Sequence, residues 1–115
     1  MPKPASTSAG YPKRGDVYLV GLDKPRPAII LSVNELNKHA LDVCIVPVTS
    51  IEHTAFSMRV PLTKEDGGLH QDCWAKCDQV TTIEKTYLQK QIGSLSTQTL
   101  QKIEQQIKVA LGLLA

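Results

Sequence analysis

The sequence has 115 residues, a formal net charge of +2 and a hydrophobic fraction of 42%. This length supports one hydrophobic core but not two, and the hydrophobic fraction excludes a chain that is disordered throughout. The small net charge excludes a uniformly basic surface, so any site for nucleic acid must be built locally from a few cations.

The N-terminal segment 1–12 contains prolines, small polar residues and a glycine. We expect it to be a flexible tail, followed by one domain over residues 13–115. No stretch approaches the roughly 20 apolar residues that span a bilayer, and the tail lacks the apolar region of a signal peptide. The cysteines are odd in number and form no CxxC pair. These features predict a cytoplasmic protein without membrane contact.

Short apolar runs with alternating character, separated by turn residues, predict a mainly β fold. A helical turn is expected at 34–39 and a connecting turn at 84–91. The strand that begins at Cys73 is expected to bend near Asp78 and Gln79. The predicted strands cover residues 15–22, 28–33, 41–48, 57–62, 73–83 and 92–95.

The last segment predicts an α-helix. Ser96 is a suitable N-cap, and Leu95 and Leu100 occupy the positions of a hydrophobic staple. One apolar stripe at helical spacing runs through Leu100, Ile103, Ile107, Ala110, Leu111 and Leu114. Such a stripe is typical of core packing. The expected architecture is therefore a small β-barrel of about five to seven strands with a C-terminal helix packed on it.

Four segments carry a family resemblance when they are taken in order. They are RGDVYLV at 14–20, RPAIILS at 26–32, VPVTS at 46–50, and a last stretch with Gly68-Leu69, CDQVTTIEK at 77–85, Leu88 and IGSLS at 92–96. Over about residues 13–112 the chain resembles the MazF/PemK family of toxins from type II toxin–antitoxin systems. The order and spacing of the segments make the signal stronger than any one of them alone.

The resemblance implies an SH3-like barrel of the CcdB/PemK type that acts as a homodimer. It implies an endoribonuclease that cuts single-stranded messenger RNA at short motifs. No metal or other cofactor is expected. Attack by the 2′-hydroxyl would leave a cyclic phosphate and a free 5′-hydroxyl. The implied protein partner is a cognate antitoxin.

One departure from the family concerns the connection between the first two expected strands. Only the segment 21–25 joins them, whereas family members usually carry a longer loop with a Gly-His/Ser-Glu-Gln element before the Arg-Pro dipeptide. In the family that loop borders the RNA groove and is contested by the antitoxin. The sequence therefore leaves an alternative open: a non-catalytic protein of this fold that binds RNA or a protein target such as DNA gyrase, as the CcdB branch does.

Arg26 is the first candidate for catalysis. It stands between Pro25 and Pro27, which restrict the backbone at the base of a long side chain. A guanidinium can contact two phosphate oxygens at once, which a lysine cannot. The alternative is a surface ion pair with Asp16 or Asp23. The family resemblance favours the phosphate-binding interpretation.

Thr49 and Ser50 match the family's VPxTS segment at the end of the third expected strand. The Thr49 hydroxyl can donate to a phosphate oxygen, so we assign it a catalytic role. The alternative is a threonine that caps the exit of the strand. Ser50 and Lys24 are assigned to RNA binding.

Asp78 matches the aspartate of the family's CDQ-type segment, for which a role as base is proposed in relatives. The resemblance thus implies that Asp78 is catalytic, while the alternative is a carboxylate that accepts backbone N–H groups in a turn. Gln79 can read a base edge or a phosphate. Lys76 stands where some relatives have an arginine, and it would bind RNA as a point charge.

The histidines and cysteines offer potential metal ligands, and Trp74 offers an aromatic contact. The spacing of the potential zinc ligands fits no standard pattern, and alternate cysteines in a strand behave as core residues, so no metal is expected. Trp74 is the only tryptophan. It has two interpretations: stacking on a base or filling the dimer interface. The potential zinc ligands are His39, His53, His70, Cys73 and Cys77.

Overall fold

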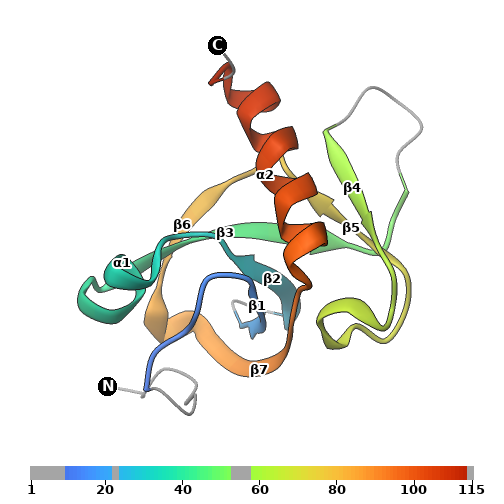
Figure 1. Cartoon of the computed structure of the whole chain (residues 1–115). Coiled ribbons are helices and arrows are strands. Elements are labelled where there is room, and N and C mark those ends of the chain that lie inside the picture. Colours follow the sequence, from blue (N-terminus) through green and yellow to red (C-terminus); the bar gives the residue numbers. More distant parts are fainter. Residues whose placement is uncertain (1–9, 22–23, 53–57, 114–115) are drawn as a thin grey trace.

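The computed structural model describes residues 10–21, 24–52 and 58–113. The chain forms strands in most of these ranges and ends in a long helix (Figure 1). In chain order the elements are β1 (Asp16–Val20), β2 (Arg26–Ile30), α1 (Asn34–His39), β3 (Asp42–Thr49), β4 (Arg59–Leu62), the 3-10 turn η1 (Asp66–Gly68), β5 (Cys73–Lys76), β6 (Thr81–Glu84), the 3-10 turn η2 (Lys85–Tyr87), β7 (Leu88–Ser94) and α2 (Thr97–Leu111).

The strands form one seven-stranded antiparallel sheet in the order β4-β5-β3-β2-β1-β7, with β6 pairing to β3 beside this path. β3 is the centre: β2 pairs with one of its edges, while β6 and β5 share the other. The prediction of a mainly β chain with a C-terminal helix is confirmed. Among the described residues, β4 and β7 do not pair with each other, so the sheet is curved and open where a closed barrel was expected (Figure 1).

Several predicted elements agree with the structure and one does not. The helical turn at 34–39 is α1, and the bend at Asp78 and Gln79 separates β5 from β6. The connecting turn expected at 84–91 is wrong in its second half, because β7 begins at Leu88. The register of β7 with β1 shifts twice, which breaks the alternation of apolar and polar residues that reveals a strand in sequence.

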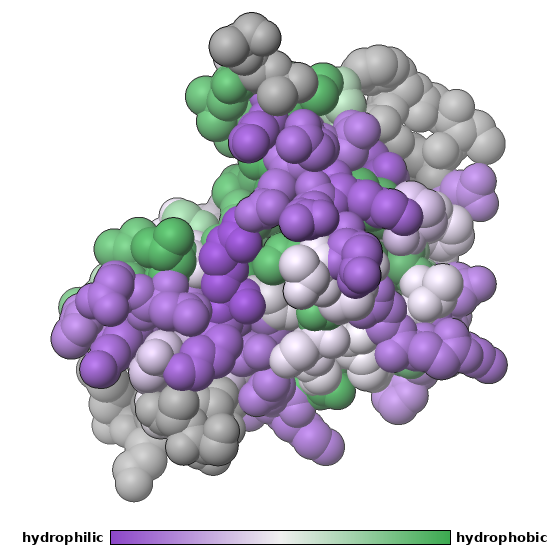
Figure 2. Space-filling model, viewed as in Figure 1, coloured by the Kyte–Doolittle hydropathy of each residue, from purple (hydrophilic) through white to green (hydrophobic). Residues whose placement is uncertain are grey.

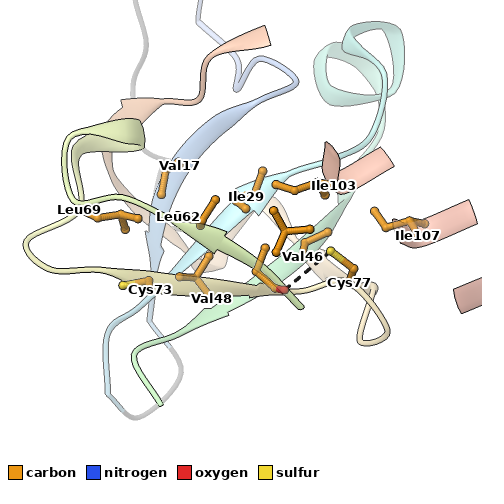
Figure 3. Close-up of a cluster of buried hydrophobic side chains, with 12 residues drawn as sticks. Val17, Ile29, Val46, Val48, Leu62, Leu69, Cys73, Cys77, Ile103 and Ile107 are labelled. Atoms are coloured by element: carbon orange, nitrogen blue, oxygen red, sulfur yellow. Dashed lines mark hydrogen bonds between the residues drawn. The ribbon is translucent and has the colours of Figure 1, made fainter. Parts of the chain in front are cut away.

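The sheet is apolar on both faces over its central strands. Successive strand residues point to opposite faces, so two separate clusters form. Figure 3 shows the first cluster, in which Ile103 and Ile107 of α2 lie against side chains from the strands. The second lies on the other face and consists of Tyr18, Val20, Ala28, Ile30, Val43, Ile45 and Leu88, with Ile83 packed against it.

Polar contacts fix α2 at its beginning and at its middle. The Ser96 side chain accepts the Thr99 backbone N–H at 3.3 Å, which confirms the predicted N-cap. Asp66 of η1 accepts the Ser96 backbone N–H at 2.9 Å. Arg14 pairs with Glu104 at 2.6 Å, which joins the start of the sheet to the helix. The first turns of α2 are therefore tied to the sheet by both polar and apolar contacts.

The predicted apolar stripe of α2 is only partly core. Ile103 and Ile107 are buried, but Leu111 is 52% exposed and Leu113 beyond the helix is 67% exposed. The end of α2 extends past the sheet, and Figure 2 shows apolar surface gathered there. Leu114, the last residue of the predicted stripe, lies outside the described residues.

Residues 1–9 of the expected tail also lie outside the described ranges. Pro12 is buried, and the Lys13 ammonium lies 3.8 Å from the centre of the Tyr11 ring. The division into a tail and a domain at residue 13 stays a prediction. In the described ranges, α2 and α1 are both too short or too polar to cross a membrane.

Tyr18 generates a prediction about alkaline stability. Its hydroxyl is buried without a hydrogen-bond partner among the described residues. Burial, and secondly the charge of Asp16, raise the pKa of Tyr18 from 10.0 to about 12. The fold therefore favours the neutral phenol. The unfolded chain ionises first, so this contribution to stability is complete below pH 10 and is lost as the pH rises towards about 12.

Tyr18→Phe keeps the apolar packing and removes the ionisable group. We expect its free energy of unfolding in urea to match or exceed that of wild type below pH 10, and to fall less between pH 10 and 12. Burial, then the charge of Asp78, raise the pKa of the Cys77 thiol to about 11, but Cys77 titrates in both proteins. Parallel pH profiles would contradict this account of Tyr18.

Candidate functional site

The candidate site forms where the start of β2, the end of β3 and the start of β5 meet. Val20 of β1 pairs with Arg26, and Trp74 of β5 pairs with both Thr49 and Pro61. When the register between β2 and β3 is extended by two residues, Arg26 falls across from Thr49. Residues directly opposite each other share a face of the sheet. One row of side chains therefore crosses the sheet and contains Arg26 and Thr49, two of the three predicted catalytic residues, at its centre.

A groove of about 500 Å³ lies at this end of the sheet, and we call it the strand-end groove. It brings together four residues that were predicted from sequence: Lys24, Arg26, Thr49 and Ser50. Its complete lining is Lys24, Pro25, Arg26, Pro27, Val48, Thr49, Ser50, Ile51, Gln71 and Cys73. Two cations and two hydroxyl groups thus surround one opening, which suits an anionic ligand.

Arg26 is the first residue of β2 and its side chain is exposed. The alternative ion pair with Asp16 is not formed, because Asp16 accepts the Lys13 backbone N–H at 2.9 Å and the Ser94 hydroxyl at 2.8 Å. Asp23 lies outside the described residues. Within the part of the chain that the structure describes, Arg26 therefore has no carboxylate partner.

Arg26 also borders a second hollow of about 190 Å³, the apolar pocket. This pocket opens on the face of the sheet that carries Tyr18 and Ile45. Its lining is Val20, Lys24, Arg26, Pro27, Ala28, Ile45, Pro47, Thr81 and Ile83. Arg26 thus lines both the strand-end groove and the apolar pocket.

Thr49 is half-buried at the end of β3. Its hydroxyl oxygen accepts the Ile51 backbone N–H at 3.1 Å. As an acceptor, Thr49 therefore caps the exit of the strand, as in the alternative interpretation. A threonine hydroxyl also carries one hydrogen to donate, which this contact does not use. Thr49 can therefore order the turn after β3 and still donate to an anion in the groove.

Asp78 and Gln79 lie apart from the strand-end groove. Both are exposed in the turn between β5 and β6, where the Gln79 backbone N–H donates to the Lys76 carbonyl at 3.0 Å. Neither they nor Lys76 are among the described residues that line the groove. Lys76 lies on the same face as Trp74, two positions along β5. One copy of the chain thus collects only part of the predicted site.

Arg59 is a residue of this face that sequence reasoning did not select. It pairs directly with Lys76 in the register of β4 and β5. Its guanidinium Nη1 donates to the carbonyl of Ile51, a groove-lining residue, at 3.0 Å. The alternation of residues 57–62 does place Arg59 on the polar face, but only the pairing of β4 with β5 shows what it faces.

The cysteines of the considered zinc site lie in the core. Cys73 and Cys77 are buried, and burial followed by a neighbouring aspartate charge raises the pKa of both thiols. A zinc ligand is a thiolate, which such burial disfavours. In the described ranges no three His, Cys, Asp or Glu side chains gather into a group that can hold a metal ion, and His53 lies outside those ranges.

The fold and the groove describe a small antiparallel-sheet protein with its polar site at the strand ends. Residues 13–111 match the family of PemK-like, MazF-like toxins of type II toxin-antitoxin systems. Because this match spans most of the sequence, the chain belongs to that family.

Individual relatives agree with this assignment. The chain is 29% identical over 114 residues to a Mycobacterium tuberculosis protein named endoribonuclease MazF9, a match that covers 88% of this chain and 97% of the relative. A solved endoribonuclease from a mycobacterial species superimposes with a TM-score of 0.76 at 31% identity, covering 88% and 91% of the two chains. A mycobacterial endoribonuclease in complex with its cognate antitoxin gives a TM-score of 0.76 at 30% identity, covering 90% and 96%.

Proposed function

We propose that this chain is an endoribonuclease toxin that cleaves single-stranded RNA in the cytoplasm. The observation that carries the proposal is the meeting of Arg26 and Thr49 across two strands in a groove with no described carboxylate partner for Arg26. Family membership and relatives named as endoribonucleases support it. Single strands are the fitting substrate because their bases and 2′-hydroxyls can be reoriented freely.

The chemistry needs charge stabilisation around one phosphate. The 2′-hydroxyl oxygen attacks the adjacent phosphorus, the bond to the 5′-oxygen breaks, and a cyclic phosphate and a 5′-hydroxyl end result. Negative charge grows on the non-bridging oxygens as the bond forms. In this proposal the Arg26 guanidinium binds two of those oxygens, and the Thr49 hydroxyl donates to one. Lys24 and Ser50 hold the flanking strand in the groove.

A base must take the proton of the attacking 2′-hydroxyl, and an acid must give a proton to the leaving 5′-oxygen. We assign the base to Asp78. In one copy of the chain Asp78 lies outside the strand-end groove. The assignment therefore goes together with a homodimer in which the groove is completed by the second subunit. Lys76 and Gln79 would contact the RNA from the same region.

A homodimer is our second expectation. A sheet of this size buries a limited core, and the end of α2 leaves Val109, Leu111 and Leu113 between 44% and 67% exposed. Sedimentation velocity at micromolar protein concentration should show a dimer. A protein that stays monomeric there would remove the basis for assigning the base to Asp78.

Substitution of Arg26 is the decisive test of the function. Arg26→Ala should slow cleavage of a long unstructured RNA by on the order of a hundredfold, as for other preorganised donors, in buffer that contains EDTA. Arg26→Lys keeps the charge but loses the fork, so it should restore RNA binding more than rate. Both variants should keep the wild-type melting temperature, because an exposed arginine at a strand start contributes little to folding.

A folded Arg26→Ala protein with full activity would show that the groove is not the active site. If wild type cleaves no long RNA, the short connection at 21–25 has removed the activity, and binding of RNA or a protein becomes the function of this fold. Cleavage that depends on added Mg²⁺ would contradict the metal-independent mechanism.

We further propose that a cognate antitoxin binds the groove through an acidic segment. The cations Lys24 and Arg26 favour carboxylates there, and a mycobacterial relative has been solved with its antitoxin. The antitoxin should compete with RNA, so its addition should raise the apparent Kd for a labelled RNA in proportion to its concentration. Binding of both at once without a change in RNA affinity would exclude a shared site.

A further inference from the structure

Two cations face each other on the sheet, and neither has an acidic partner among the described residues. Arg59 of β4 and Lys76 of β5 are direct partners in the antiparallel register. Like charges directly opposite each other destabilise a strand pair. Within the described ranges the ion pairs are Arg14–Glu104 and His39–Glu35, so neither cation of this pair is neutralised by a carboxylate. An anion bound between them would remove the repulsion.

The Arg59 guanidinium makes one hydrogen bond that positions it and has one buried donor without a partner among the described residues. Its Nη1 donates to the Ile51 carbonyl at 3.0 Å, which fixes the group next to the strand-end groove. Its Nε is buried and has no hydrogen-bond partner among the described residues. A buried donor without a partner is costly, and costlier when it belongs to a charged group. Because Arg59 as a whole is half-buried while its Nε is buried, the terminal nitrogens are the ones that an added anion can reach.

Trp74 lies between this cation pair and the proposed catalytic residues. It is two positions from Lys76 on β5 and directly opposite Thr49 of β3. Neighbouring strands lie about 4.8 Å apart, so the indole borders both groups. Its face is the one turned away from α2, because Val60 and Ala75, which alternate with these residues, are buried in the cluster under α2. Trp74 is half-buried.

We propose that the Arg59–Lys76 pair binds a second phosphate of the RNA and that Trp74 stacks on the adjoining base. This inference rests on the proposed function. It adds to the cleavage point a second contact region for the RNA, which we call the RNA track and which consists of Arg59, Trp74 and Lys76. The RNA crosses β3, β5 and β4, with the scissile phosphate at Arg26 and Thr49. Base–aromatic stacking is sequence-tolerant but favours some bases, so Trp74 contributes to the choice of cleavage motif.

The cation pair is tested with an RNA that cannot be cleaved, namely a mixed-sequence single strand with 2′-fluoro in place of every 2′-hydroxyl. The double variant Arg59→Gln, Lys76→Gln should bind it at least about tenfold more weakly, and the slope of log K against log salt should fall by about 0.7 for the lost phosphate. Arg59→Lys should recover most of the salt slope. The matched control Lys102→Gln removes an exposed cation from α2, on the other side of the sheet, and should leave both quantities unchanged.

The melting temperature of the double variant distinguishes a cation pair that binds RNA from one that only stabilises the fold. Because the two cations repel each other in the free protein, the double variant should melt at the wild-type temperature or above it. Weaker binding with an unchanged or higher melting temperature supports the proposal. A lower melting temperature with unchanged RNA affinity and salt slope overturns it and makes the pair a structural feature.

The tryptophan fluorescence of the protein comes from Trp74, because it is the only tryptophan. Addition of the 2′-fluoro RNA should quench its fluorescence. Trp74→Phe should keep the affinity within a few-fold, whereas Trp74→Leu, which keeps apolar bulk but cannot stack, should weaken binding by about tenfold. If the fluorescence emission of Trp74 does not change when RNA is added but shifts when the protein is diluted, Trp74 belongs to the dimer interface and the stacking proposal is overturned.

The same experiments distinguish a failure of the RNA track from a failure of the proposed nuclease function. If wild type cleaves RNA and Arg26→Ala does not, while the double variant binds and cuts like wild type, the track is wrong and the nuclease stands. If the 2′-fluoro RNA binds with the expected salt slope and quenching but no RNA is cut, the track stands and the nuclease is wrong. In an active enzyme the double variant should raise KM more than it lowers kcat, because it acts away from the reacting phosphate.

Discussion

The pairing register of β3 determines both which residues form the core and where the candidate site lies. β3 pairs with β2, β5 and β6, and each pairing assigns every second residue to one face. A slip of one residue would move Val46 and Val48 out of the cluster under α2 and turn Thr49 towards it. The apolar pattern that stabilises the core therefore also decides on which face the side chains of the candidate site lie. Packing and function are set by the same alignment of strands.

This arrangement places the candidate site where a buried face of the sheet becomes an exposed one. The face with Tyr18 and Ile45 is core over β1, β2 and the first half of β3. Further along, the same face carries Arg26, Thr49, Trp74 and the Arg59–Lys76 pair, which are half-buried or exposed. Side chains there stand on paired strands, so their positions are held by the ladder, while their tips reach the solvent. A rigid base with accessible groups suits a site that must stabilise charge.

The sequence predicts best what depends on local chemistry. Ser96 as a cap and the break at Asp78 follow from residue types within a few positions, and both are present. Arg26 and Thr49 were selected through the family resemblance, and their meeting rests on a long-range register that periodicity cannot reveal. The strand at Leu88 was missed because bulges interrupt its alternation. Arg59 was missed for a different reason, since its meaning lies in its cross-strand partner and not in its neighbours along the chain.

The short connection between β1 and β2 gives the open face of β4 and β5 its importance. Val20 and Arg26 are paired, and only the five residues 21–25 join them in the sequence. A nuclease with a small net charge still needs contacts on either side of the scissile phosphate to hold it in line. On the described surface the neighbouring groups suited to this are Lys24 at the groove and Arg59, Trp74 and Lys76 across the sheet. Contacts supplied by paired strands hold their geometry without first having to order a flexible segment.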